Sequence, residues 1–247
     1  MHPHLKPLFS KIFDLNWKFG LFLILLVCVP RFVLVLQANA SGNYGAIGLI
    51  MTVSALAPFL FLSKAGRMDI GIKKAQGFKW LFLAFLAGLA ASIFLYFLGK
   101  ILYDTSYQNW YQYIGKSYKI PADISAADKR VMFGIMAITG MIFSPIGEEL
   151  FFRGIVHKSF ENSIGEKKAS IVDGSAFALT HITHFGLVFV NEQWAFYPIP
   201  TILWVLSMFL VSLMFFFFGK KSSSLLGAIA CHAAFNLGMI YCIFYGM

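Results

Sequence analysis

Seven apolar stretches, each long enough to cross a bilayer, constrain this chain more than any other feature. A spanning helix needs about 20 mostly apolar residues, because it rises about 1.5 Å per residue through a hydrocarbon core about 30 Å thick. We therefore expect an all-α, polytopic membrane protein with about seven transmembrane helices. They should cover roughly residues 18–37, 44–63, 80–99, 131–157, 169–190, 199–218 and 224–246. Pro145 in the fourth stretch should kink that helix or end its first half.

The composition agrees with a membrane protein. Hydrophobic residues make up 59% of the chain and charged residues only 13%, whereas soluble domains average about 45–50% and about 25%. A soluble core of this length cannot hide so much apolar surface, but lipid can solvate it. Neither an internal repeat nor a soluble segment of domain size is visible, so residues 1–247 are predicted to form a single integral membrane domain.

The formal net charge of +9 indicates orientation in a membrane and not nucleic-acid binding. With the N-terminus inside, the inside connections hold thirteen Lys and Arg residues and the outside connections hold five. Cytoplasmic loops of membrane proteins are enriched in these residues. We expect a multi-pass protein of the cell (inner) membrane with a cytoplasmic N-terminus. The lipid bilayer is its expected surrounding, and no nucleic-acid partner is expected.

The outside segment of roughly residues 100–130 is rich in Tyr and Trp at near-helical spacing. Amphipathic rings settle at the level of the lipid headgroups. This pattern predicts a short helix that lies on the outer membrane surface. A resting surface segment is the favoured interpretation, and a lid that recognises a substrate is the alternative.

Ionisable residues inside the apolar stretches are concentrated in three of the seven. A charged group in the bilayer is costly, so each such residue is a functional hypothesis. The first stretch has only Arg31. The three polar stretches hold Glu148, Glu149 and Arg153; Asp173, His181 and His184; and His232. This concentration predicts a shared polar cavity inside the membrane.

The two adjacent glutamates of the fourth stretch should have different roles. Successive helical residues point about 100° apart, so Glu148 and Glu149 cannot share one face. Glu149 and Arg153 are four residues apart and can pair along the helix. Glu148 is then available for chemistry. The alternative is that both glutamates only neutralise Arg153.

Histidines occupy the other two polar stretches. His181 and His184 lie three residues apart, so they could bind a metal together with a carboxylate, or one could work while the other is a hydrogen-bonded structural residue. We favour a structural role for His184. His232 and Asn236 lie four apart on one face, where Asn236 could hold a water, orient the imidazole or only link two helices.

These residue types support hydrolysis without a covalent intermediate. A glutamate among apolar walls can act as general base on a water, and imidazoles can donate to the oxyanion that forms on the attacked carbonyl. No Ser or Cys has a convincing nucleophile setting, and the zinc-protease pattern HExxH is absent from the sequence. We therefore expect no metal and no cofactor, with zinc as the alternative.

Three motifs in order resemble those of the CPBP family (CAAX protease and bacteriocin-processing, Abi-type) of glutamate-dependent intramembrane proteases. They are Glu148-Glu149-x-x-x-Arg153, Phe177-x-x-x-His181 and His232-x-x-x-Asn236. The resemblance covers roughly residues 131–246, the expected catalytic core. It implies that Glu148 activates water, that His181 and His232 stabilise the oxyanion, and that Asn236 supports them. Glu149 and Arg153 match the supporting positions of the first motif.

The resemblance implies an endopeptidase that cleaves a membrane-associated protein or peptide. A non-catalytic scaffold or bacteriocin-immunity protein of the same fold is one alternative, and a proton-coupled transporter is another. Counting residues from the ends of the spans predicts that Glu148, His181 and His232 lie in the inner half of the membrane. The cavity is therefore expected to open toward the cytoplasm.

Overall fold

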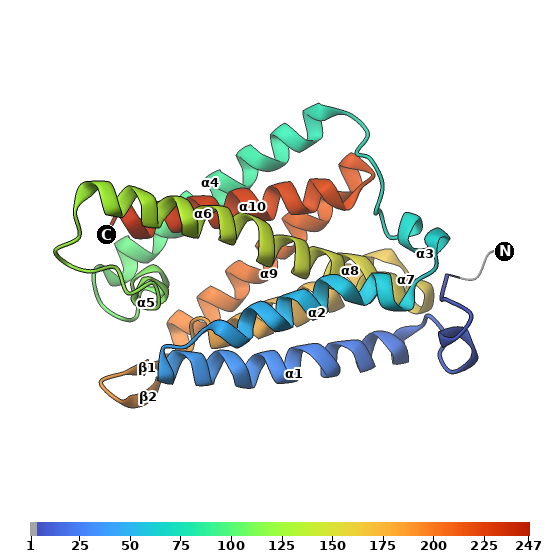
Figure 1. The fold of residues 1–247 in the computed structure, drawn as a ribbon, viewed down its shortest axis with the longest axis horizontal. Coiled ribbons are helices and arrows are strands. Elements are labelled where there is room, and N and C mark those ends of the chain that lie inside the picture. The colour runs from blue at the N-terminus through green and yellow to red at the C-terminus, as the bar shows by residue number, and fades with distance from the viewer. Residues whose placement is uncertain (1–3) are drawn as a thin grey trace.

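The computed structural model describes residues 4–247, which fold into a bundle of helices with one small β-hairpin (Figure 1). The longer helices are α1 (Trp17–Ser41), α2 (Gly45–Phe61), α4 (Phe78–Tyr103), α6 (Ala126–Glu148), α8 (Glu166–Thr180), α9 (Pro198–Ser222) and α10 (Leu225–Tyr245). The shorter helices are α3 (Lys64–Asp69), α5 (Trp110–Lys116) and α7 (His157–Ile164), and the strands are β1 (Leu187–Val190) and β2 (Gln193–Phe196).

Five helical stretches within residues 4–247 are long and apolar enough to cross a membrane. The expected all-α polytopic membrane protein is thereby confirmed. The other two predicted spans correspond to shorter helices, since α2 has 17 residues and α8 has 15. The five stretches are Trp17–Ser41, Phe78–Tyr103, Ala126–Ile164, Pro198–Ser222 and Leu225–Tyr245.

The fourth predicted span is one continuous helix of 39 residues and does not end at Pro145. Pro145 lies inside α6, and a π-helical segment, Glu149–Val156, follows and leads directly into α7. Proline lacks the N–H that would bond to the carbonyl four residues earlier, so the regular ladder is already interrupted here. π-Helical turns are rare and occur frequently at functional sites. The first motif coincides with this wider turn.

The fifth predicted span, 169–190, is wrong in its second half. α8 ends at Thr180, a single 3-10 turn follows, and β1 then pairs antiparallel with β2. The two-residue turn between the strands consists of Asn191 and Glu192, both with positive φ. Such a turn matches the twist of a hairpin, and Asn is one of the residues that tolerates it best. The local turn chemistry thus overrides the apolar character of the stretch.

The aromatic segment after α4 also differs from the prediction. A short helix, α5, does form, but its rings point into the protein and not toward the headgroups. Trp110 and Tyr111 are fully buried, and they donate hydrogen bonds to the backbone carbonyls of Leu95 and Ser92, respectively. Trp110 also stacks on Trp204 of α9 at 6.0 Å between ring centroids. These polar tips satisfy carbonyls of other elements, so α5 closes one end of the bundle.

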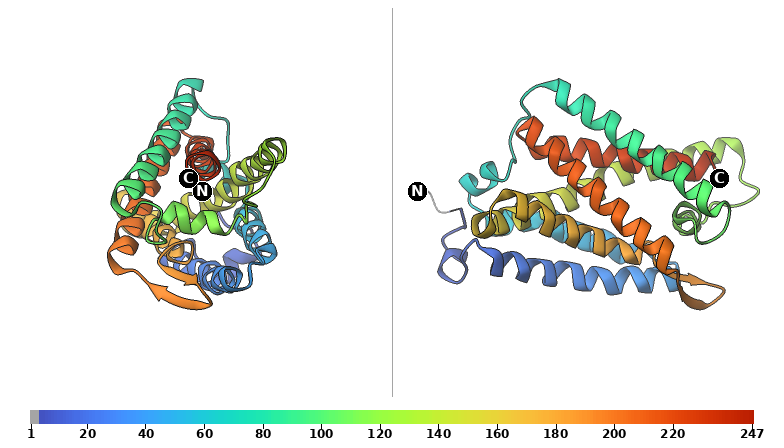
Figure 2. Two further views of the ribbon diagram at one scale, coloured as in Figure 1. Left: turned by 90° about the vertical axis from the view of Figure 1, so that its left-hand side faces the viewer. Right: turned by 180° about the vertical axis from the view of Figure 1, so that it is seen from behind.

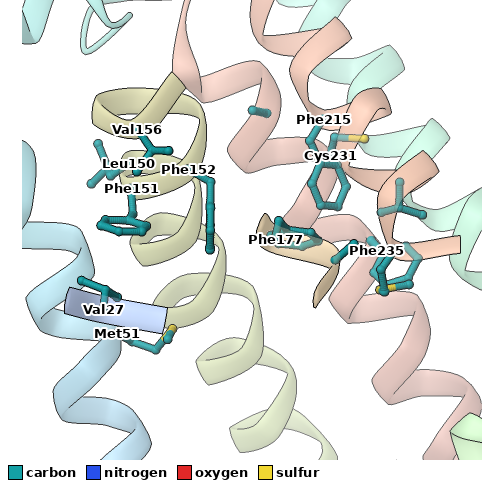
Figure 3. Packing of buried hydrophobic residues seen from close by; sticks show 14 of the residues in the cluster. Val27, Met51, Leu150, Phe151, Phe152, Val156, Phe177, Phe215, Cys231 and Phe235 are labelled. Atoms are coloured by element: carbon teal, nitrogen blue, oxygen red, sulfur yellow. The ribbon is translucent and has the colours of Figure 1, made fainter. Parts of the chain in front are cut away.

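The bundle has two different ends. The α3 end carries α3 and the α9–α10 turn, and the α5 end carries α5, the hairpin and the C-terminus (Figure 1). α10 lies in the middle, against α4, α6 and α9 (Figure 2). Figure 3 shows Phe151 directed toward Val27 and Met51, and Phe152 directed toward Phe177. Apolar packing on both sides therefore fixes the helix that carries the first motif.

Candidate active site

Glu148 is almost fully buried and is held through only one of its carboxylate oxygens. Its Oε1 accepts a hydrogen bond from Arg31 Nη2 at 2.7 Å and another from the Ser144 hydroxyl at 2.9 Å. Its Oε2 accepts no hydrogen bond within residues 4–247. His232 Nε2 lies 4.0 Å from Oε2. One oxygen is fixed and the other is available.

Glu149 has an ion pair at one oxygen and a hydrogen bond at the other. Its Oε2 lies 3.3 Å from Arg153 Nε, which confirms the predicted pair four residues apart. Its Oε1 accepts a hydrogen bond from His232 Nδ1 at 2.8 Å. The two glutamates point in different directions as predicted, yet they reach opposite nitrogens of the same imidazole.

Arg153 connects Glu149 to a second buried acid. Its Nη2 donates to the Ser212 hydroxyl at 2.6 Å, and its Nε lies 4.0 Å from Asp173 Oδ1. The guanidinium also lies over the Phe177 ring at 4.3 Å. Asp173 Oδ2 lies 2.6 Å from His157 Nδ1. We call Glu149, Arg153, Asp173 and His157 the ion network.

His181 occupies the 3-10 turn that ends α8. Its Nδ1 lies 2.8 Å from the carbonyl oxygen of Phe177, which can only accept, so this nitrogen carries the hydrogen. The adjacent His184 lies with its ring 5.4 Å from that of His181, and its Nε2 is 3.5 Å from Arg31 Nη2. Both histidines are half-buried.

Asn236 links two helices. Its Nδ2 donates to the carbonyl of Gly140 on α6 at 3.0 Å. The His232 ring is fixed by other groups, namely Glu149 and the Phe215 ring, which stacks on it at 4.5 Å. The structure therefore favours the helix-linking interpretation of Asn236 over the one in which it orients the imidazole.

All four residues predicted to be catalytic line one cavity of about 250 Å³. They are Glu148, His181, His232 and Asn236, and Arg31 and His184 line it with them. The rest of its wall is largely apolar and aromatic. The expected polar cavity inside the helical bundle is thus present, and residues far apart in sequence meet there.

The cavity extends toward the α5 end, which the charge count places outside, whereas the sequence predicts an opening toward the cytoplasm. The orientation in the membrane stays a prediction. Ile114, Ser117 and Tyr118 from the α5 region line it. A smaller cavity of about 90 Å³ shares Ile114 and Ser117 with it and is lined by Lys116 and Lys119 near the surface. Counting residues gave the depths of Glu148, His181 and His232 but not the segments that line the rest of the cavity, and α5 belongs to these.

Two functional partners were missed by the sequence interpretation. Arg31 was noticed as the only charge in the first apolar stretch but was not assigned to Glu148. Its presence was the signal, because a cation inside a bilayer needs a partner. His157, the partner of Asp173, gave no signal, since it lies at the predicted end of a span where a polar residue is ordinary.

Within residues 4–247, no three or more His, Cys, Asp or Glu side chains lie in an arrangement that could hold a metal ion. Next to Glu148, the Arg31 guanidinium supplies the positive charge. The expectation that no metal takes part stays a prediction, which elemental analysis can test.

The fold and the cavity together define a class: multi-pass helical membrane proteins with an acid and histidines gathered inside the bundle. Residues 130–238 match the protein-family model described as Type II CAAX prenyl endopeptidase Rce1-like. All three motifs lie inside that region, so the match confirms the resemblance to the CPBP family over this part of the chain. The matched family is one of intramembrane CAAX-type proteases. No curated protein and no solved structure matches the chain.

Proposed function

We propose that this protein is an intramembrane endopeptidase in which Glu148 activates the water that hydrolyses a peptide bond. The observation that carries the proposal is the asymmetry of this carboxylate. Oε1 is anchored by Arg31 and Ser144, and Oε2 has no hydrogen-bond partner among the described residues and lies beside His232 in the cavity. A general base needs one such oriented and unoccupied oxygen.

The reaction follows from this geometry. Oε2 of Glu148 takes a proton from a water, whose oxygen attacks the carbonyl carbon of the substrate. The carbonyl electrons move onto its oxygen, and nearby donors stabilise that oxyanion. When the tetrahedral intermediate collapses, the C–N bond breaks and Glu148 returns the proton to the departing nitrogen. No covalent enzyme intermediate is needed.

His232 and His181 are the proposed oxyanion donors. Each ring already engages an acceptor through Nδ1, so each can donate to the oxyanion only through a protonated Nε2. The buried cluster contains two guanidinium groups, Arg31 and Arg153, against the carboxylates of Glu148, Glu149 and Asp173. One proton shared among His157, His181 and His232 would neutralise this cluster, so one imidazolium donor is consistent with the charge balance.

We propose a membrane-associated protein or peptide as the substrate, as the family implies. Its scissile segment reaches the cavity from the α5 end, because Ile114, Ser117 and Tyr118 line that part. If the charge count sets the orientation, this end faces the outside. A single cysteine introduced at Ser117, in a variant that lacks Cys28, Cys231 and Cys242, should react with membrane-impermeant thiol reagents added outside intact cells. Labelling only after the membrane is opened would place this end in the cytoplasm.

Two other functions are the alternatives that an experiment must separate from proteolysis. A non-catalytic scaffold or immunity protein would not need an anchored carboxylate with an unoccupied oxygen. A transporter would use the same acid and histidines as a proton relay. Neither predicts a cleaved product.

The decisive experiment compares cells that carry the wild-type protein with cells that carry Glu148→Gln. The membrane proteins of the two strains are compared by mass spectrometry of their termini. We expect at least one membrane-associated protein to accumulate uncleaved in the variant strain, and its product to form when purified wild-type protein is added in detergent. A scaffold or transporter would give identical termini in both strains, and that result would refute the proposal.

A further inference from the structure

A further cavity, of about 330 Å³, lies at the α3 end and is not part of the proposed active site. Its walls come from the segment after α3, from α7, and from the turn between α9 and α10. Lys73 and Lys220 are exposed at its mouth, and Arg153, His157 and Ala228 are buried at its floor. A volume of this size accommodates a small ligand or a headgroup.

The buried end of this cavity contains a cation with unused hydrogen-bonding capacity. Arg153 is 5% exposed, and its Nη1 makes no hydrogen bond within residues 4–247. Guanidinium groups present donors in a planar fork that suits phosphate oxygens. Buried donors are normally satisfied, so an unsatisfied one that lines a cavity points to a ligand.

The net charge of the wall favours an anion. Four cationic side chains line the cavity, namely Lys73, Arg153, Lys158 and Lys220, against the carboxylates of Asp69 and Glu161. These two acids both pair with Lys158, at 2.9 Å and 3.0 Å. Lys73 at the mouth has no ion pair within residues 4–247, and Lys220 contacts Glu166 outside the cavity wall. Arg153 at the floor pairs with Glu149 and keeps its Nη1 without a partner.

The position of the cavity indicates the source of the anion. It lies where two membrane-length helices end, since α9 stops at Ser222 and α10 begins at Leu225. The ends of spanning helices lie at the level of the lipid headgroups. Basic pockets between membrane helices on the side rich in Lys and Arg are suited to the headgroups of anionic lipids.

We propose that this cavity binds the phosphodiester headgroup of an anionic phospholipid, with Arg153 at its floor and Lys73 and Lys220 at its mouth. The binding site is separate from the cavity around Glu148, so it stands whether or not the protein is a protease. The binding site is linked to the proposed active site through Arg153, which is also the ion-pair partner of Glu149.

The test measures the thermal midpoint of the purified, delipidated full-length protein in neutral detergent during titration with defined lipids. The lipids are phosphatidylglycerol, phosphatidylethanolamine and phosphatidylcholine, and inorganic phosphate is a separate arm. A ligand that binds the folded state raises the midpoint as its concentration passes its dissociation constant. We expect phosphatidylglycerol to act at a concentration about tenfold lower than the other two lipids, a difference of the size expected for one or two lysines near a headgroup.

The matched variants decide where that lipid binds. Lys73→Gln combined with Lys220→Gln should weaken the phosphatidylglycerol effect about tenfold. Lys167→Gln combined with Lys168→Gln removes the same charge from exposed positions at the same end, outside the cavity, and should leave the effect within about twofold. Native mass spectrometry, which counts retained lipids directly, provides a readout that is independent of stability.

Three results would overturn the proposal. Equal effects of all three lipids would show that no anionic headgroup is selected. An equal loss in both double variants would show a general surface charge effect. Saturation by inorganic phosphate that abolishes lipid retention in the same range would identify a site for free phosphate and not for lipid.

Discussion

Glu148 and Glu149 are adjacent in the sequence, yet the regions that surround them are built differently. Glu148 has one anchored oxygen and one unoccupied oxygen beside a cavity. Glu149 lies between Arg153 and His232 and belongs to the ion network, in which each ionic side chain contacts another. The difference shows how one short motif can provide both a reactive group and the structure that holds it. His232 joins the two regions, because its two nitrogens face the two glutamates.

The strongest test of this comparison is Glu148→Gln. The change removes the proton-accepting oxygen and keeps the side-chain volume, so hydrolysis should fall by about 10²- to 10⁴-fold, the usual contribution of a general base. Rates are measured per folded molecule on the substrate found in the accumulation experiment. Glu192→Gln in the exposed hairpin turn is the matched control and should retain full activity. Normal turnover by the Glu148 variant would show that Glu148 is not the general base.

Glu149→Gln should affect folding more than chemistry. It leaves Arg153 without its closest carboxylate, and breaking a buried ion pair typically costs about 3–5 kcal/mol. We expect a lower thermal midpoint and lower yield in detergent, with a smaller loss of activity per folded molecule than for Glu148→Gln. If instead the Glu149 variant is stable but inactive, the assignments of the two glutamates must be exchanged.

Arg31→Lys tests how Glu148 is oriented. Lysine keeps the charge but cannot reproduce the guanidinium that lies 2.7 Å from Oε1 and 3.5 Å from His184. The loss of one charge-assisted hydrogen bond predicts a decrease in kcat of about tenfold, with little change in KM. Lys18→Gln, on the same helix but outside the cavity, is the control. A purely structural role of Arg31 would lower the thermal midpoint and leave kcat per folded molecule unchanged.

The sequence was sufficient where a single physical rule dominates. Length and hydropathy identified all five membrane-length helical stretches of residues 4–247, along with two shorter helices, and the spacing of Glu149 and Arg153 identified their ion pair. The sequence was insufficient for features that depend on tertiary contacts. The pairing of Arg31 with Glu148 joins residues 117 positions apart, and no local pattern encodes it. The direction of the cavity depends on Ile114, Ser117 and Tyr118, which come from a segment that the sequence places on the membrane surface.

The smallest expected effect is that of metal removal. Glu148 and Glu149 each contact a guanidinium, and the Nδ1 atoms of His181 and His232 are engaged by an acceptor. A divalent ion next to Glu148 would be repelled by Arg31, so the positive charge at the site is already provided by the protein. We expect far less than one metal ion per chain in elemental analysis of the active purified protein, and unchanged rates after chelation. However, the two histidines also present free Nε2 atoms to the cavity, and ligating histidines commonly donate their other nitrogen to a carboxylate or carbonyl. One stoichiometric zinc, with activity lost on chelation and restored by zinc, would therefore contradict the glutamate mechanism and assign Glu148 to metal-assisted hydrolysis.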